Sequence, residues 1–501
     1  MSLGEFLLVA VLAVPALGAV AVAATPRDRA ARVVGAVAAA VTLLAAALLA
    51  LGGRTWSGYT PTAPAVRPWH RVDLPWVPGL ELRFHLGVDG ISWPLVVLTA
   101  LLTLLCCGYT LWKVPDGGSG RALVALLLVV EVGILGTFLA LDLVLFFVFF
   151  EVVLLPMYAV IAGWGGADRR RAARKFALYT LLGSVLLLVG VYVVVAAAGT
   201  ADIVALTGGG GLSRGTQLAA FTLLALAFAV KSPLWPLHSW LPDAHTQAPT
   251  VGSVILAGVL LKMGTYGLIR VAVGVAPEGA RWAAPVLGAL AVAAILVGAL
   301  VCLAQDELKR LIAYSSVGHM GFVLLGVATL TSTGLQAALI GNVAHGVITG
   351  LLFFLAGAIK DRAHTGSLAE LSGLRETAPR LAGLLGFAAV ASLGLPGLAG
   401  FWGEAFAVIA AIEVGGAFWT TLGVLAALGG ALTAAYFLRL LRRVTHGRPS
   451  PAVARSTAGL AGAEVTAWAP LVLLALAVGL APALVLGVAE APVDALVEVL
   501  P

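Results

Sequence analysis

Apolar segments long enough to cross a lipid bilayer recur along the whole chain, and this repetition limits the possible folds more than any other feature. A helix needs about 20 apolar residues to span a hydrocarbon core about 30 Å thick. Short segments of alternating polarity, typical of a transmembrane barrel, do not occur. We therefore expect an all-α polytopic membrane protein with about 14 transmembrane helices. The expected spans are approximately 3–24, 33–52, 89–111, 121–141, 143–163, 175–199, 216–239, 250–273, 282–304, 311–330, 334–359, 381–411, 416–440 and 464–487.

The distribution of charge gives an orientation for these spans. Of the 501 residues only 11% are charged, whereas a soluble domain has roughly 25%. The net charge of +6 would suit nucleic acid, but most of the 30 Lys and Arg residues lie in the loops that follow odd-numbered spans. Basic loops of this kind remain in the cytoplasm. The positive charge is therefore a topology signal, and we expect no nucleic-acid partner.

The N-terminal span is expected to be a retained helix. A signal peptide carries its positive charge before the apolar core, but here Glu5 precedes the core, and Arg27 and Arg29 follow it. With fourteen crossings, this order predicts that both termini lie on the outer side of the membrane. The connection 53–88, rich in Pro, Gly and Trp, is expected to hold turns or a short hairpin.

Sequence motifs for cofactors and metals are missing from the chain. The cysteines Cys106, Cys107 and Cys302 lie inside apolar segments without a CxxC or zinc-type spacing. We therefore expect them to be small core residues. No P-loop or Rossmann glycine fingerprint occurs either. Any oxidoreductase activity is thus expected to belong to an assembly of which this chain is one part.

Seven ionisable residues interrupt the apolar spans at depth. A charged side chain at the bilayer centre costs roughly 2.5–3.5 kcal/mol. Each residue alone has a simple explanation, because a lysine can extend to the interface, a buried glutamate can stay protonated, and a histidine can pack between helices. The whole set, spread over separate spans, indicates a polar path through the membrane. Its members are Glu131, Glu151, Lys231, Lys262, His319, His345 and Glu404.

The chemistry of these residues suits proton transfer. A carboxylate near a lysine in a low-dielectric environment stabilises the charged pair, and loss of the carboxylate favours release of the lysine proton. Glu151 and Lys231 are the natural switch pair. Lys262 and the two histidines are the natural centre of a relay, because imidazole titrates near neutral pH. Glu404 is the acid expected at the exit side.

Two of the spans are expected to contain broken helices. The segment KSPLWPLHSWLP, 231–242, has three prolines, and each removes an amide donor and clashes with the preceding turn. The segment SLGLPGLAGFWGE, 392–404, is interrupted by Gly and Pro. Ordinary proline kinks are the alternative. Paired interruptions that each carry a charge, however, are typical of transporters built from inverted repeats.

Four segments of the chain resemble the antiporter-like subunits of respiratory complex I. They are FFEVVLLPMY (149–158), the block 228–267, KRLIAYSSVGHMGF (309–322) and GLPGLAGFWGE (394–404). The resemblance implies a fourteen-helix fold with two inverted five-helix repeats, spans 4–8 and 9–13, in which helices 7 and 12 are broken. It implies an N-terminal three-helix segment 1–120, repeats within 121–273 and 282–440, and a C-terminal part 441–501.

The same resemblance implies a role for each buried residue. Glu151 and Lys231 match the paired switch, and Lys262 matches the central relay lysine. His319 and His345 match the relay histidines, Glu404 the terminal acid, and Glu131 a further acid. Glu404 favours subunit M and its mitochondrial counterpart, subunit 4, since the other paralogues typically have lysine there.

The resemblance also implies a cellular setting. The chain is expected in the cell inner (plasma) membrane, between the paralogous subunits L and N of a proton-translocating NADH–quinone oxidoreductase. NADH, FMN, iron–sulfur clusters and quinone would be bound by other subunits, and protons would be the cargo. Three alternatives stay open: a subunit of a multisubunit sodium/proton antiporter, a subunit of a membrane-bound hydrogenase, and a non-pumping spacer.

Overall fold

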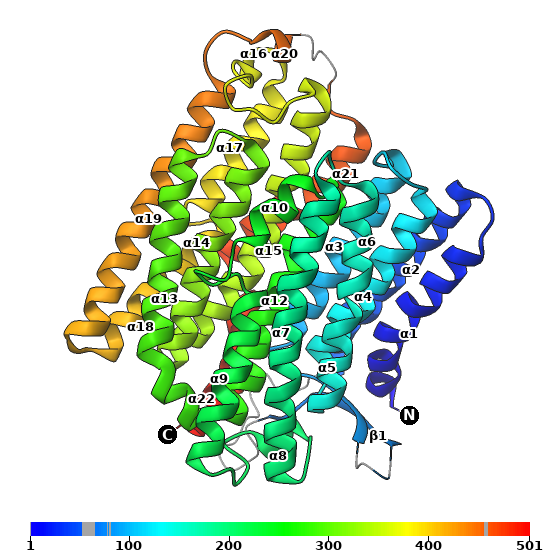
Figure 1. Cartoon of the computed structure of the whole chain (residues 1–501). Coiled ribbons are helices and arrows are strands. Elements are labelled where there is room, and N and C mark those ends of the chain that lie inside the picture. The colour runs from blue at the N-terminus through cyan, green and yellow to red at the C-terminus, as the bar shows by residue number, and fades with distance from the viewer. Residues whose placement is uncertain (1, 53–65, 78, 80–81, 455–458, 501) are drawn as a thin grey trace.

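A computed structural model of the chain describes residues 2–52, 66–77, 79, 82–454 and 459–500. Its long helices run side by side along one axis (Figure 1). Within the described residues, twelve helical spans are long and apolar enough to cross a membrane. Two further spans are interrupted, the seventh and the twelfth. The expected all-α fold of about 14 transmembrane helices is therefore confirmed.

The first eight spans include three that change helix type or break. The N-terminal three are α1 (Leu3–Ala24), α2 (Asp28–Leu48) with η1 (Leu49–Gly52), and α3 (Trp93–Trp112). The next three are α4 (Gly120–Leu139), α5 (Leu143–Val152) with α6 (Leu154–Trp164), and α7 (Arg169–Ala198), which the short α8 (Ile203–Leu206) follows. The seventh span is α9 (Arg214–Lys231) and α10 (Trp240–Gln247). The eighth is α11 (Thr250–Ile255), η3 (Leu256–Leu260), α12 (Leu261–Gly267) and η4 (Leu268–Val273).

The second repeat also contains one broken span, the twelfth, and the C-terminal part follows it. Spans nine to eleven are α13 (Pro277–Ala304), α14 (Leu308–Ala328) and α15 (Ser332–Ala363). After the short α16 (Leu374–Thr377), span twelve is α17 (Pro379–Ser392) and α18 (Ala399–Val414), and span thirteen is α19 (Gly416–Thr445). The chain continues through α20 (Pro451–Ala454), α21 (Gly462–Leu480) and α22 (Ala483–Glu498). The broken spans seven and twelve are five crossings apart, so they run in opposite directions, as an inverted repeat requires.

The expected hairpin is present in the described part of the connection 53–88. Strands β1 (His70–Val77) and β2 (Leu82–Val88) pair antiparallel. Arg83 and Asp73 form an ion pair across them at 2.6 Å. The hydrogen bond from Arg83 holds the pKa of Asp73 below its usual value. Residues 53–65 lie outside the described residues.

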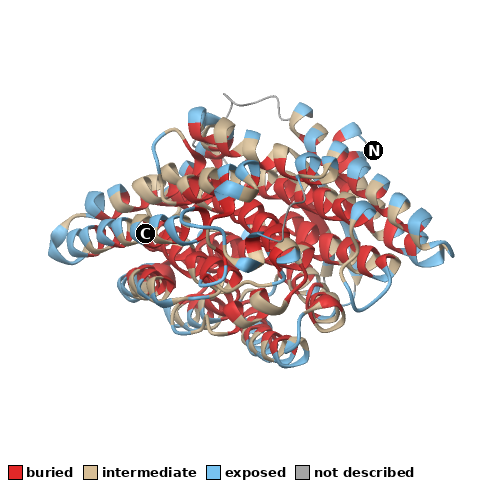
Figure 2. Cartoon of the chain, turned by 90° about the horizontal axis from the view of Figure 1, so that it is seen from above, coloured by how far each residue is buried: buried red, intermediate tan, exposed pale blue. Residues whose placement is uncertain are grey.

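Burial separates a central set of helices from a peripheral set (Figure 2). The apolar window of the eighth span is wholly buried, and those of α15 and α14 are 94% and 89% buried. The corresponding windows of α7 and α19 are only 33% buried, so these helices offer large apolar faces to their surroundings. The three cysteines are buried in the core, as the sequence predicted, and their thiols are free. Polar residues inside these buried windows, such as Lys262 on α12 and His345 on α15, are therefore held inside protein.

Two helix boundaries differ from the sequence prediction. The fifth span is interrupted at Val153, because Pro156 lacks an amide hydrogen and its ring clashes with the carbonyl of Val152. The fourteenth span ends at Leu480 instead of near residue 487, because Pro482 disfavours helical geometry at Ala481. The separate helix α22 that follows was not predicted. Both ends of the chain lie at the same end of the bundle (Figure 1).

Candidate functional site

The break in the seventh span leaves Lys231 as the last residue of α9. The lost helical hydrogen bonds are partly replaced, since Trp240 Nε1 donates to Val230 O at 3.0 Å. Lys231 is only 2% exposed. Its ammonium lies 4.7 Å from the centre of the Phe150 ring and has no hydrogen-bond partner among the described residues. A buried ammonium held only against an aromatic face is stabilised less than one in an ion pair.

The predicted switch pair lies close together but is not in contact. Glu151 is on α5, next to Phe150, and its carboxylate accepts a hydrogen bond from Ser184 on α7. Its charge acts on Lys231, yet no ion pair within 4.0 Å joins these two described side chains. The structure therefore shows the pair in a separated arrangement, with the acid held by a hydroxyl.

The eighth span places Lys262 at the centre of the bundle. Lys262 is fully buried, on the α-helical turns of α12 between the π-helical segments η3 and η4. Wide turns of this kind are rare and often occur at functional positions. The ammonium donates to Ala257 O at 2.5 Å and lies 2.6 Å from His345 Nδ1.

Two glycines allow this close contact between η3 and α15. A Cβ at Gly346 would lie 2.6 Å from Gly258 O, so any larger residue would push the helices apart. Gly346 follows His345 directly. Lys262 and His345 are thus in contact, and the packing of small residues sets how closely their helices approach.

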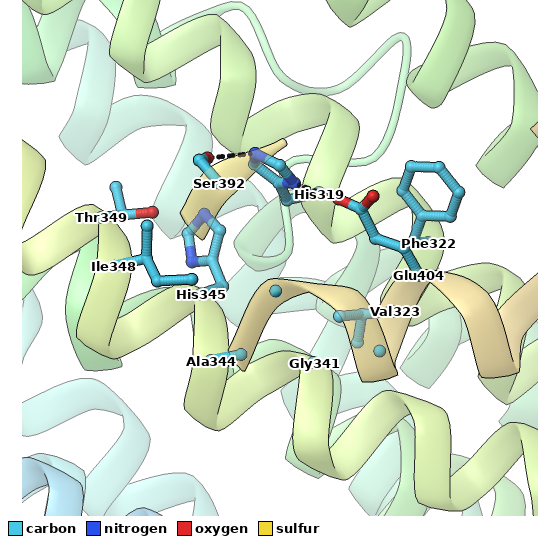
Figure 3. A pocket seen from close by; sticks show the side chains of 12 residues that line it. His319, Phe322, Val323, Gly341, Ala344, His345, Ile348, Thr349, Ser392 and Glu404 are labelled. Carbon is cyan, nitrogen blue, oxygen red and sulfur yellow. Dashed lines mark hydrogen bonds and ion pairs between the residues drawn. The ribbon is translucent and has the colours of Figure 1, made fainter. Parts of the chain in front are cut away.

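His319 on α14 contacts both halves of the broken twelfth span. Its Nδ1 lies 2.8 Å from Oε1 of Glu404, which is on α18. Its Nε2 lies 2.9 Å from Oγ of Ser392, which is the last residue of α17. Gly394 has a left-handed φ of +79°, and a Cβ there would lie 2.9 Å from Glu404 Oε2. The interruption therefore folds a glycine turn over the acid and presents Ser392 and Glu404 to the same ring (Figure 3).

A small cavity links the two histidines. Their ring centres are 5.8 Å apart. The cavity, about 20 Å³ in volume, is lined by His319, His345, Thr349, Ser392 and Glu404 among others (Figure 3). This volume is enough for one water molecule. His345 Nε2 has no protein partner in the part of the chain that the structure describes. Lys262, His345, His319 and Glu404 thus form one polar series across four spans.

Glu131 does not join this series. It is fully buried on α4, and within the described residues neither carboxylate oxygen has a hydrogen-bond partner. The charged residues of the series are not among the groups that act on it. Its charge acts on the thiol of Cys107 on α3. The structure therefore brings six of the seven predicted residues into two groups and leaves the seventh apart.

His245 is a site residue that the sequence analysis missed. It lies on α10, is fully buried, and has no hydrogen-bond partner on either ring nitrogen among the described residues. Its ring stacks on Phe353 with centres 4.5 Å apart, and the charges of Lys309 and Lys262 both act on it. The available signal was the histidine in SWLPDAH, fourteen positions after Lys231. That segment looked like a loop, because proline interrupts it.

Two cations near helix ends are buried. Lys309 is 5% exposed and Arg270 is 3% exposed. Arg270 forms an ion pair with Asp89, which also accepts hydrogen bonds from Ile91 N and Ser92 N at the start of α3. This pair joins the end of the eighth span to the start of the third. Hydropathy alone does not show that these two positions are buried, because tertiary packing covers the helix ends.

No group of three or more His, Cys, Asp or Glu side chains in the described residues is arranged to hold a metal ion. The clusters instead pair one acid or histidine with one base or hydroxyl. Such pairs suit the movement of protons between neighbours, because each group can both accept and donate a proton.

Comparison with known proteins gives the same picture for the family. Residues 140–429 match the family model described as NADH:quinone oxidoreductase/Mrp antiporter, TM. The chain is 40% identical over 470 residues to NADH-quinone oxidoreductase subunit M of Rhodobacter capsulatus, covering 91% of this chain and 88% of that protein. It is 43% identical over 380 residues to an NAD(P)H-quinone oxidoreductase chain 4 of Synechococcus sp. (strain JA-3-3Ab), covering 75% and 72%.

Two solved structures extend the similarity to nearly the whole fold. A chain of respiratory complex I from Thermus thermophilus with bound NADH superimposes with a TM-score of 0.86 at 31% identity, covering 99% of this chain and all of that one. A chain of the Mrp complex from Dietzia sp. DQ12-45-1b gives a TM-score of 0.85 at 25% identity, covering 99% and 98%. With its broken seventh and twelfth spans and its buried lysines, the chain belongs to the NADH:quinone oxidoreductase/Mrp antiporter transmembrane family.

Proposed function

We propose that this chain is a proton-translocating membrane-arm subunit, of subunit M type, of an NADH–quinone oxidoreductase. One observation carries the proposal: Lys262, His345, His319 and Glu404 are linked by contacts of 2.6 and 2.8 Å and by a cavity that can hold one water. Burying four such groups in a membrane is costly, and ionisable groups at this depth usually mark an ion or proton path. The similarity to subunit M of Rhodobacter capsulatus supports the choice of complex.

In this proposal the second repeat conducts protons by short transfers. When Lys262 donates to His345 Nδ1, that nitrogen must be the acceptor, and Nε2 carries the hydrogen. Nε2 can pass its proton to water in the cavity while Nδ1 gains one from the lysine. A proton that reaches His319 Nε2 allows Nδ1 to release one to Glu404 Oε1. Each ring thereby takes a proton on one side and gives one up on the other.

The first repeat supplies the switch in the same proposal. With Glu151 held by Ser184 and away from Lys231, the lysine has no counterion in contact, which favours its neutral form. Movement of the carboxylate toward the lysine would favour the ammonium again. Alternation between these two arrangements would take up and release one proton in each cycle. We assign Glu131 no step, and we place His245 on the path that leads to Lys262.

The setting of the chain follows from the same proposal. Subunits L and N would contact its two sides, and other subunits would bind NADH, FMN, iron–sulfur clusters and quinone. The basic segments near residues 169–175 and 439–448 lie at the end of the bundle opposite to the termini (Figure 1), which supports termini on the outer side of the cell inner membrane. We propose the four parts 1–120, 121–273, 282–440 and 441–501 as its organisation.

A sodium/proton antiporter subunit is the second candidate, and the similarity to the Mrp complex of Dietzia favours it. Glu404 and the higher identity to subunit M support the first candidate. Proton uptake by a purified complex that is unchanged when sodium is removed would favour the oxidoreductase. Strict dependence of transport on sodium would favour the antiporter. A non-pumping spacer would have no use for the Lys262–His345 contact.

The test is NADH-driven proton uptake by inverted membrane vesicles that contain the complex with Lys262→Arg. Arginine keeps the positive charge but does not release its proton, because its guanidinium stays protonated throughout the accessible pH range. We expect assembly at the wild-type level and a loss of proton uptake. Wild-type uptake per quinone reduced in this variant would refute the proposed path.

A further inference from the structure

The buried Lys309 lies at the base of a second cavity, which the proposed function does not yet use. This cavity has a volume of about 310 Å³ and lies where the α3–α4, α6–α7 and α10–α11 connections meet the end of α15. Exposed Asp116 and Lys360 line its mouth. Buried Ala248, Pro249 and Lys309 line its base. The cavity therefore leads from the surface to the end of α10.

Local structure fixes Lys309 in this place. Glu307 caps α14, and its carboxylate accepts a hydrogen bond from Arg310 N at 2.6 Å. Leu308 N donates to Gly366 O at 2.9 Å, which holds the start of α14 against the segment after α15. The segment after α15 thereby covers the first turn of α14, and the Lys309 side chain is buried.

The ammonium of Lys309 lacks a carboxylate partner. It donates to Ala248 O at 3.1 Å, and no carboxylate of the described residues lies within 4.0 Å. Another lysine of the same cavity, Lys113, pairs with Asp361 at 2.6 Å. A buried ammonium bonded only to a neutral carbonyl is costly, and loss of its proton removes that cost.

His245, whose ring nitrogens have no hydrogen-bond partner among the described residues, lies close in sequence to the carbonyl that Lys309 contacts. Lys309 donates to the carbonyl of Ala248, which caps the C-terminus of α10 and lies three positions after His245. Among charged groups, Lys309 and Lys262 are those that act on the His245 ring. The positions of the three residues therefore lead from the cavity to the Lys262–His345 contact.

We propose that Lys309 is the proton-accepting group at the cytoplasmic mouth of the path. The Lys309 ammonium gives one proton to a ring nitrogen of His245, and the amine left neutral then takes one proton from cytoplasmic water that enters through the cavity. His245 passes its proton toward Lys262. This inference rests on the proposed function and adds its loading site. The alternative is that Lys309 only anchors the Ala248 carbonyl.

Lys309→Arg and Lys309→Gln separate the two roles. Both side chains can donate to the Ala248 carbonyl, but arginine does not release its proton and glutamine carries none. We expect both variants to assemble and to lower NADH-driven proton uptake about a hundredfold, at the lower edge of the range for a lost proton-transfer group. Lys175→Arg is the matched control, because this surface lysine pairs with Asp243 outside the cavity, and we expect wild-type uptake.

The outcomes also distinguish this inference from the proposed function. Loss of uptake in both Lys309 variants with normal assembly supports the loading role. Wild-type uptake in either assembled variant overturns it, since an anchor tolerates both replacements. If Lys262→Arg still abolishes uptake in that case, the proposed function stands without this loading site. If Lys262→Arg also pumps normally, the proposed function itself is wrong.

Discussion

The two repeats hold their acid–base pairs in opposite arrangements. In the first repeat, Lys231 at the end of α9 lacks a hydrogen-bond partner within the described part of the chain, and Glu151 binds Ser184 instead. In the second, Glu404 on α18 contacts His319 at 2.8 Å, and Ser392 binds the other ring nitrogen. Both pairs lie beside a broken helix. The break therefore places an ionisable group in the membrane, and packing of the neighbouring helices decides whether it is paired.

The comparison suggests a division of labour. A separated pair is easy to close and reopen, because the competing hydroxyl bond is worth only about 1 kcal/mol net. A contacting pair with a second hydrogen bond keeps one geometry. The first repeat thus suits a switch and the second suits a fixed conductor. Lys262 connects them, because α12 packs against α9 of the first repeat and its ammonium reaches His345 of the second.

The largest effect is expected where the two repeats are joined. Lys262→Met removes the ammonium but keeps most of the side-chain volume. We expect NADH-driven proton uptake to fall at least about a hundredfold, since the Lys262 ammonium is the group that contacts His345 of the second repeat. Proton uptake by inverted vesicles measures this. Lys175→Met on the surface is the control, and retained uptake in the Lys262 variant would mean that the repeats work separately.

The next largest effect is expected in the contacting pair. Glu404→Lys puts an ammonium against His319 and disfavours protonation of the ring, so we expect coupled quinone reduction to fall about tenfold, or about 1.4 kcal/mol. Glu413→Lys, at an exposed position on the same helix, should leave the rate unchanged. Unchanged coupling in Glu404→Lys would remove this acid from the conductor.

A smaller effect is expected from the separated pair. Lys231→Ala and Glu151→Ala should leave assembly largely intact and lower coupled activity about fivefold, because the switch is lost while the conductor remains. Proton uptake per quinone reduced is the measurement, and Glu376→Ala, at an exposed acid, is the control. If both variants pump and reduce quinone like the wild type, the switch assignment is wrong.

The smallest effects should distinguish the two hydroxyls. Ser392→Ala removes one hydrogen bond from the fixed conductor, so we expect coupled activity to fall about threefold. Ser184→Ala frees Glu151, so the Glu151–Lys231 pair should close more often. We therefore expect the pH optimum of coupled activity to shift and its maximum rate to stay the same. Infrared difference spectra of the carboxylate region would follow Glu151 directly. Equal loss in both serine variants would argue against two distinct arrangements.

Much of this architecture follows from the sequence. The apolar segments predicted the spans, and the prolines near residue 233 and the glycines near residue 394 predicted the two breaks. The six residues that the structure groups were all predicted from their place inside apolar segments. The break at Val153 and the start of α22 follow simple proline rules, but the apolar character of both regions concealed them.

Contacts could not be predicted in the same way. The sequence does not show that the Glu131 carboxylate lacks a hydrogen-bond partner among the described residues. Nor does it show that His245 and Lys309 are buried. Each of these facts depends on how neighbouring helices are rotated and how closely they approach. Glycine pairs such as Gly258 with Gly346 and Gly341 with Gly403 set that approach, and the partners in each pair are more than 60 positions apart.

The sequence by itself determined which residues enter the membrane and where the helices break, because the transfer cost of a side chain and the missing amide of proline are local properties. Only the tertiary structure decided which ionisable groups meet. Proton transfer needs hydrogen-bond distances, and those distances are fixed by packing between helices far apart in the chain.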